Sequence, residues 1–427
     1  MTRRITISFE GIIIVIGFII SLLNSTLLIL FTIVFPLLLL LLSGTKGALL
    51  SLWMIQLRSI LNPGIIVQFE GSAAIAKWGM IFLLSGFIII SCRKKIMNNI
   101  IKRVVFLICV FSGYCIFSAI LVSSYPLVSA FKVFSYTIPF ISVILGIYYV
   151  SDVNWTKIIL ISLGFVLFSG VLVYRHPVGY FRNGYAFQGI ISHPNVFGAM
   201  LALFVACYIH YEKKLGIRQI PILGFAVLLA VASGSRTGML SIVIALIVYL
   251  FTFELRLDLK IALYILMTIV IGMLLFSTGM FEVLQELLFK GHTDSILYSR
   301  IGQINTNMER IISHPITGTG FNVPYQEGIR NWSFSFDLSV ENGNIVLALL
   351  GDTGIIGIIL FAIAFLQIFK TGFGMMATMF FVPFAVSMGE MSFFSTNNFG
   401  IVMYFMLAIF LTDAIKKKDE LILLLES

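Results

Sequence analysis

Runs of about twenty apolar residues follow one another along most of the chain, and they constrain the fold more than any other feature. A helix needs about 20 mostly apolar residues to cross the roughly 30 Å hydrocarbon core of a bilayer with its backbone groups bonded internally. Candidate spans lie at residues 11–23, 25–43, 47–60, 74–92, 101–123, 128–150, 157–173, 195–211, 219–234, 237–253, 260–279, 343–369, 374–391 and 399–414. The sequence predicts an all-α, polytopic integral membrane protein with about 12–14 transmembrane helices in one domain, residues 1–427.

Composition supports this prediction. Charged residues make up 11% of the chain and hydrophobic residues 59%, whereas soluble domains carry about 25% charged residues. A water-soluble fold is thereby excluded. The weakest span is 47–60, which is short and contains Arg58, so a half-span or an interfacial helix is an equal alternative there. The four cysteines fall in or beside apolar runs without metal-ligand spacing, so we expect no disulfide and no metal site.

The basic residues indicate the orientation of the chain, because lysine and arginine are in excess on cytoplasmic loops. With fourteen spans, twelve of the fifteen lysines lie on one side, and both termini share that side. We therefore expect both termini in the cytoplasm, with the chain in a bacterial cytoplasmic membrane. The net charge of +9 is then a topology signal, and it gives no reason to expect a nucleic-acid partner.

Arginines depart from this pattern. Six of the thirteen fall on or near the expected outer side, namely Arg175, Arg182, Arg236, Arg300, Arg310 and Arg330. A guanidinium presents a rigid fork of donors that matches carboxylate or phosphate oxygens. An arginine set on the outer side therefore predicts an anionic ligand.

Two outer segments are long enough to carry a site. Residues 174–194 are rich in aromatic residues, and residues 280–342 form the one long hydrophilic stretch. Within 280–342, apolar residues recur at helical spacing from Leu297 to Ile311, which predicts an amphipathic helix on the outer membrane face. We expect this helix to end at the HPITGTG sequence that begins at His314, because proline and glycine break helices.

Arg236 lies between two apolar runs, in the sequence VASGSRTGML. A charge at such a position is costly and usually marks a site or a pathway. The alternative is a snorkelling arginine in a loop at the outer interface, which the flanking glycines permit.

Short motifs follow one another in a set order over roughly residues 175–370: RNG in the first outer segment, then HPN, SGSR, HPITGTG and GDTGIIG. This order resembles the O-antigen polymerase and ligase family. The resemblance implies an all-helical membrane glycosyltransferase that works without a metal or another cofactor. Members transfer glycans from polyprenyl diphosphate carriers on the outer face of the cytoplasmic membrane.

The resemblance also implies roles for individual residues. Arg182, Arg236 and Arg300 match the family's donor-binding arginines, which agrees with the independent argument from their unexpected side. Supporting roles fall to Asn195, Arg310, Asn344 and Asp352. For Asp352, donor positioning and a structural hydrogen bond are equal alternatives.

One segment departs from the family pattern. Ligases of the family carry a histidine pair before the final glycine motif, whereas Gly343 and Glu341 occupy those positions here. This difference favours the polymerase branch. The candidates for the base that deprotonates the acceptor hydroxyl are Glu341, then His314 and His193. Each has a structural alternative. The histidines stand in HP dipeptides, which often only organise turns, and Glu341 could merely cap a helix.

The predicted function is therefore a polysaccharide polymerase that joins lipid-linked repeat units of an O-antigen, capsule or exopolysaccharide. Ligation of a finished glycan to a lipid, wall or protein acceptor is one alternative, and a flippase for lipid-linked glycans is another. The expected partners are a polyprenyl-diphosphate-linked oligosaccharide and membrane lipids, with a flippase and a chain-length regulator implied by the resemblance.

Overall fold

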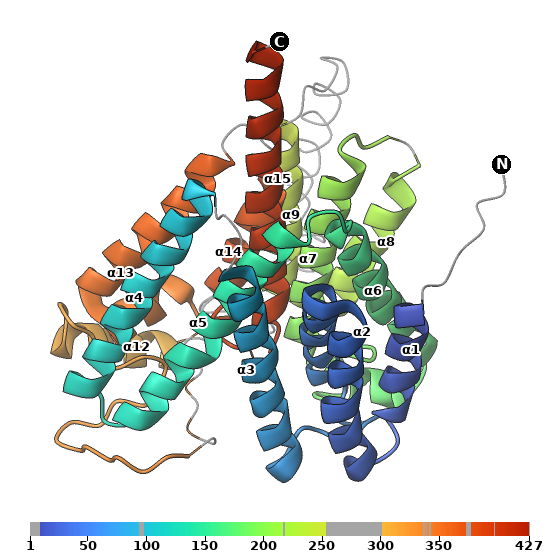
Figure 1. Cartoon of the computed structure of the whole chain (residues 1–427). Helices are drawn as coiled ribbons and strands as arrows, with labels where there is room; N and C mark the ends of the chain where they lie inside the picture. The colour runs from blue at the N-terminus through green and yellow to red at the C-terminus, as the bar shows by residue number, and fades with distance from the viewer. Residues whose placement is uncertain are drawn as a thin grey trace, which may run out of the picture.

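The computed structural model describes residues 9–93, 98–216, 218–252, 301–335, 338, 340, 343–372, 377–396 and 398–426. These residues form helices joined by loops, and no strand occurs among them beyond an isolated bridge between Leu61 and Ile191 (Figure 1). The prediction of an all-α protein is confirmed.

The helices are α1 (Phe9–Ile20), α2 (Ser25–Ser59), α3 (Gly71–Arg93), α4 (Asn99–Val122), α5 (Pro126–Tyr149), α6 (Trp155–Ser169), α7 (Pro194–Glu212), α8 (Ile220–Ala232), α9 (Arg236–Thr252), α12 (Ile301–Ser313), α13 (Ile345–Thr371), α14 (Thr378–Gly389) and α15 (Gly400–Glu426). Two short 3₁₀ helices, η1 (Gly170–Val173) and η2 (Pro177–Tyr180), follow α6.

Seven segments within the described part of the chain are long and apolar enough to cross a bilayer: α2, α3, α4, α5, α6 with η1, α7 and α13. Shorter apolar helices, α8, α9 and α14, pack beside them. Large apolar side chains remain exposed along α3, α4, α8 and α13, as expected where lipid is the solvent. The protein is a multi-pass membrane protein. The predicted span 260–279 lies outside the described residues, and the count of 12–14 spans stays a prediction.

Helix α2 contains a sharp kink at Gly44, which separates the two apolar runs predicted there. Its second arm is almost entirely buried from Gly47 to Arg58. Arg58 donates from Nη2 to the carbonyl of Ser21 at 3.0 Å and from Nε to the Ser21 hydroxyl at 3.1 Å, just beyond the end of α1. Protein therefore surrounds this arm, and Arg58 satisfies the carbonyl of Ser21, which follows the end of α1.

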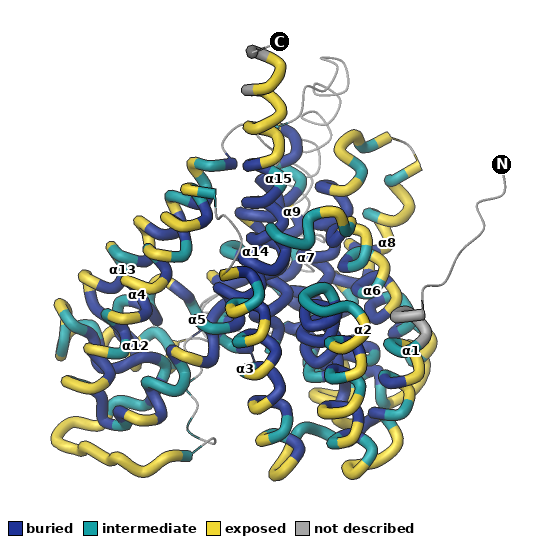
Figure 2. Tube along the Cα trace, in the orientation of Figure 1, coloured by how far each residue is buried: buried dark blue, intermediate teal, exposed yellow. Residues whose placement is uncertain are grey.

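Helix α7 is the central element of the fold. Within its apolar window 89% of residues are buried, against 39% for α4, and α7 contacts α6, α8, α9 and α14. Figure 2 shows the same distribution, with buried residues concentrated in the middle of the bundle and exposed residues on the outer helices. Packing on several sides therefore fixes the position of α7, including its N-terminus at Pro194, where the preceding loop ends.

Hydrogen bonds between connections define two faces of the bundle. On the first, which we call the loop face, Asn62 donates to the carbonyls of Val178 and Gly189 at 2.9 and 3.1 Å, and Asn331 donates to that of Ser124 at 2.7 Å. On the second, the C-terminal face, Lys416 Nζ donates to the carbonyl of Ser151 at 2.6 Å. Alternate connections thus meet on opposite faces, as the predicted path of the chain requires.

Candidate functional site

The segment between η1 and α7 is a folded loop that presents Arg182 at its surface. The buried amide of Gln188 accepts the backbone N–H of Arg182 at 2.9 Å and donates to the carbonyl of Ile191 at 2.9 Å. Asn62, which is fully buried, fastens the other side of the loop. The backbone at Arg182 is therefore fixed, while its side chain is exposed.

The same loop joins the turn that carries Arg236. The N–H of Phe187 donates to the carbonyl of Ala232 at 3.0 Å, where α8 ends. Ser235, the residue before Arg236, accepts the N–H of Gly238 at 3.2 Å and so caps α9. The loop of Arg182 and the turn of Arg236 thus form one connected unit on the loop face.

Small residues bring the starts of α7 and α9 together. A Cβ atom on Gly198 would lie 2.3 Å from that of Ser235, and one on Gly238 would lie 2.5 Å from the Gly198 carbonyl carbon. Side chains larger than hydrogen would therefore separate the two helices. As a result, Asn195 and Arg236, each in the first turn of its helix, lie on neighbouring segments.

The end of α14 closes this group. Asn195 Nδ2 donates to Glu390 Oε1 at 2.9 Å. Thr237 lies against Gly389, because a Cβ atom added to Gly389 would be only 2.0 Å from Oγ1 of Thr237. On the other side, Asn344 Nδ2 donates to the carbonyl of Met388 at 3.1 Å.

Three helices, α7, α9 and α13, therefore begin around the end of α14, and we call the residues Asn195, Arg236, Asn344 and Glu390 the junction cluster. Asn344 also caps α13 by accepting the N–H groups of Val346 and Leu347. A helix N-terminus carries a partial positive charge and favours anions. The cluster therefore combines the guanidinium of Arg236, which is half-buried, with three helix N-termini and one carboxylate.

His193 has a structural role beside the cluster. Its Nδ1 accepts the N–H of Asn195 at 3.1 Å and caps α7. This contact fixes the ring beside the junction cluster and requires that Nδ1 carry no proton.

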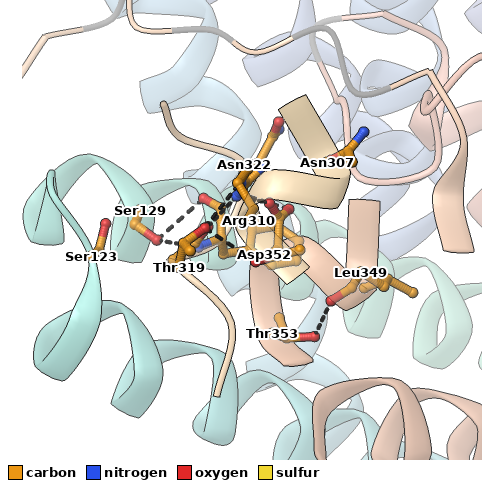
Figure 3. Close-up of polar contacts among 12 residues, drawn as sticks. Ser123, Ser129, Asn307, Arg310, Thr319, Asn322, Leu349, Asp352 and Thr353 are labelled. Atoms are coloured by element: carbon orange, nitrogen blue, oxygen red, sulfur yellow. Dashed lines mark hydrogen bonds and ion pairs between the residues drawn. The ribbon is translucent and has the colours of Figure 1, made fainter. Parts of the chain in front are cut away.

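Arg310 and Asp352 lie in a different arrangement, shown in Figure 3. They form a salt bridge in which the side chains are 1% and 0% exposed. Arg310 also donates to the Thr319 hydroxyl at 2.8 Å and to the carbonyl of Gly320 at 3.0 Å, and the other oxygen of Asp352 accepts the N–H of Asn322 at 2.8 Å. Both charges are satisfied by protein groups, so this pair holds the HPITGTG segment against α13.

Further contacts attach this segment to α4 and α5. Ser118 donates to the carbonyl of Thr317 at 2.7 Å, and Ser129 accepts the N–H of Phe321 at 2.7 Å. Lys132 Nζ donates to the carbonyl of Asn322 at 2.6 Å. The segment therefore belongs to the packed structure of the loop face.

Helix α12 ends at Ser313, directly before HPITGTG, as predicted. Its polar residues Asn307 and Arg310 are buried, whereas the apolar residues Met308 and Ile312 are 42% and 74% exposed. These apolar side chains thus face away from the protein, and the position of the helix at a membrane surface stays a prediction.

Among the described candidates, His314 is not brought to the junction cluster. His314 is half-buried at the end of α12, with its ring 5.5 Å from that of Tyr325. Arg300 and Glu341 lie outside the described residues. Among the described candidates, the structure brings Asn195, Arg236 and Asn344 together and pairs Arg310 with Asp352.

A polar cavity of about 520 Å³ opens on the C-terminal face, between the α5–α6 connection, α7 and α15. It is lined in part by His210, Asp413 and Lys416, and none of the predicted site residues lines it. His210 Nε2 lies 2.9 Å from Asp413 Oδ2, so this pair links α7 to α15.

Sequence reasoning missed the position of Glu390. The only signal available was an acidic residue in a largely apolar stretch, which marks a costly charge but names no partner. Its contact with Asn195 spans 195 residues of sequence, so only the tertiary structure assigns Glu390 to the junction cluster.

Comparison with known proteins supports the family inferred from the sequence. Residues 221–362 match the family model described as O-antigen ligase. The match includes Arg236, the Arg310–Asp352 pair and the HPITGTG segment, and it ends before α14. A search of curated proteins finds no match to this chain. The resemblance inferred from the motifs is confirmed.

Proposed function

We propose, because residues 221–362 match the family model described as O-antigen ligase, that the protein is a polysaccharide polymerase. The family supports glycan transfer in general. The finer proposal is that the protein joins lipid-linked oligosaccharide repeat units at the loop face, with polyprenyl diphosphate as the leaving group. The loop face would then be the outer face of a bacterial cytoplasmic membrane.

The observation that carries this proposal is the position of Arg236 in the junction cluster. A diphosphate that leaves from an anomeric carbon gains charge in the transition state, and fixed positive charges bind it more tightly as that charge develops. Arg236 and three helix N-termini supply such charges. Arg182, on the loop bonded to the end of α8, provides a second guanidinium, and Arg300 is proposed as a third; together they would take the part that a metal ion plays elsewhere.

The backbone at Gly343 supports polymerisation over ligation. Its φ of 68° lies in the left-handed region that residues with a Cβ seldom adopt. A histidine at this position, as the ligase pattern has, would be strained in the conformation that leads into α13.

The test is reconstitution of the purified protein in liposomes with polyprenyl-diphosphate-linked repeat units, followed by separation of the products by glycan length. We expect a ladder from the wild type. Arg236→Ala should reduce the initial rate by about 10² to 10³-fold, the range seen when one preorganised donor to a developing anion is removed.

Arg218→Ala is the matched control, because Arg218 is exposed in the connection between α7 and α8 on the C-terminal face. It should leave the ladder unchanged. An Arg236→Ala protein that still makes polymer at the wild-type rate would refute the arginine-dependent donor site. A wild type that extends glycans only when a lipid or peptide acceptor is added would be a ligase, and one that moves the carrier across the bilayer without extension would be a transporter.

A further inference from the structure

Glu390 is the one carboxylate that the described residues place in the junction cluster. It directly follows α14 and is half-buried. Its Oε1 accepts a hydrogen bond of 2.9 Å from Asn195 Nδ2, at the start of α7. An amide that donates to one oxygen restricts the orientation of the carboxylate.

The residues around Glu390 adjoin those proposed to bind the donor. Gly389, its neighbour in sequence, lies against Thr237, the neighbour of Arg236. Met388, one residue earlier, is bonded to Asn344 at the start of α13. A donor whose diphosphate is bound at Arg236 and these helix N-termini would therefore place its anomeric carbon close to Glu390.

The other described candidates for a base are less well placed. His193 uses Nδ1 to cap α7, and His314 lies at the end of α12 beside the separate Arg310–Asp352 pair. An ionised carboxylate has about four acceptor positions, so Glu390 can accept a hydrogen bond from a sugar hydroxyl in addition to those from its protein partners.

From this geometry we infer that Glu390 is the catalytic carboxylate that takes the proton from the acceptor hydroxyl. The inference rests on the proposed function. The acceptor oxygen forms a bond to the anomeric carbon, while the bond from that carbon to the diphosphate oxygen breaks and its electron pair leaves with the diphosphate. The hydroxyl proton moves to Glu390, which releases it to water before the next transfer. Asn195 is a positioning residue that orients the carboxylate.

The inference is tested with Glu390→Gln in the same liposomes, because glutamine keeps the shape of the side chain and cannot take the proton. We expect kcat to fall by about 10² to 10⁴-fold, with little change in the KM for the lipid-linked donor. We also expect Glu390→Gln to bind a sugar-free polyprenyl diphosphate with the same affinity as the wild type, whereas Arg236→Ala should bind it more weakly.

The pH profile separates a base from a structural carboxylate. Wild-type kcat should rise with pH as Glu390 ionises, and this acidic limb should be absent from the residual activity of Glu390→Gln. Glu390→Asp keeps an ionisable group, so it should regain part of the rate together with the limb, and it serves as the test if the glutamine variant does not fold. Asn195→Ala should lower kcat less than Glu390→Gln does and retain the limb.

Glu309→Gln is the matched control, since Glu309 is exposed on α12, and it should behave as the wild type. If the wild type extends glycans and Glu390→Gln does so at the same rate, or keeps the acidic limb, the inference is wrong while the proposed function stands. If the wild type transfers no glycan to any acceptor, the proposed function itself fails.

Discussion

At the scale of the residue, the same amino acid serves two purposes in this protein. Arg236 lies half-buried among helix N-termini on the loop face, whereas Arg310 is almost fully buried and bonded to Asp352, Thr319 and Gly320. An arginine whose donors are occupied by protein groups cannot also bind a diphosphate without losing them. The supporting role expected for Arg310 and Asp352 is therefore proposed to be structural.

The buried pair gives a prediction for stability. Arg310→Met leaves the Asp352 carboxylate buried without its partner, so the free energy of unfolding should fall by about 3–5 kcal/mol. The double variant Arg310→Met, Asp352→Leu removes both charges and should lose less than the two single variants added together. Unfolding in mixed detergent micelles measures these values. Arg103→Met is the control, because Arg103 is exposed, and it should change stability by less than about 0.5 kcal/mol. If the losses of the single variants Arg310→Met and Asp352→Leu simply add in the double variant, the two residues are not a coupled pair.

At the scale of the element, close backbone contact joins the HPITGTG segment to α13. Helix α13 has a kink at Gly354, the N–H of Thr319 donates to the carbonyl of Gly351 at 2.9 Å, and that of Ile355 donates to the carbonyl of Pro315 at 2.9 Å. A Cβ on Gly318 would lie 2.3 Å from the backbone of Asp352. The glycines of both motifs therefore permit two backbones to pair without side chains between them.

Gly318 and Gly328 make a matched test of this contact, because both have a φ of 71° but only Gly318 faces a close neighbour. Gly328→Ala should cost about 1–2 kcal/mol of stability, the cost of the left-handed conformation alone. Gly318→Ala should cost distinctly more, because the new methyl group must also push the segment away from α13. Thermal unfolding in detergent compares the two variants, and equal losses would show that the close contact is unimportant.

At the scale of the whole molecule, the junction cluster and the C-terminus lie on opposite faces of the bundle. The hydrogen bond from Lys416 to Ser151 places the end of α15 beside the α5–α6 connection. Asn195 lies at the start of α7 and Glu390 directly follows α14, and the two side chains meet on the loop face. Donor chemistry and the basic C-terminal segment should thus be separated by the membrane.

This arrangement is tested by labelling single cysteines in a cysteine-free background. Gly184→Cys, exposed in the loop after η2, should react with a membrane-impermeant maleimide added to intact cells. Lys417→Cys, exposed on α15, should react only after the membrane is opened. The reverse result would place the loop face in the cytoplasm and would exclude transfer on the outer surface.

The sequence by itself determined the fold class and the segments that carry it. Apolar runs predicted helices because a backbone in hydrocarbon must bond to itself, and the predicted ranges 25–43 and 47–60 correspond to the two arms of α2 on either side of Gly44. The order of motifs identified the family, and the end of α12 followed from the proline and glycines after it. These features depend on residues close together in the chain, which sequence reports directly.

Only the tertiary structure decided which of the polar residues meet. Arg236 and Arg310 both appear in the sequence as unexpected arginines, yet Arg310 is paired with Asp352, 42 residues away, and Arg236 lies among the ends of helices distant in the chain. Glu390 was one acid in an apolar stretch until α7, α9 and α13 were seen to begin around it. The physical reason is that the role of a buried charge depends on its partners, and packing of helices selects those partners at separations that no local pattern encodes.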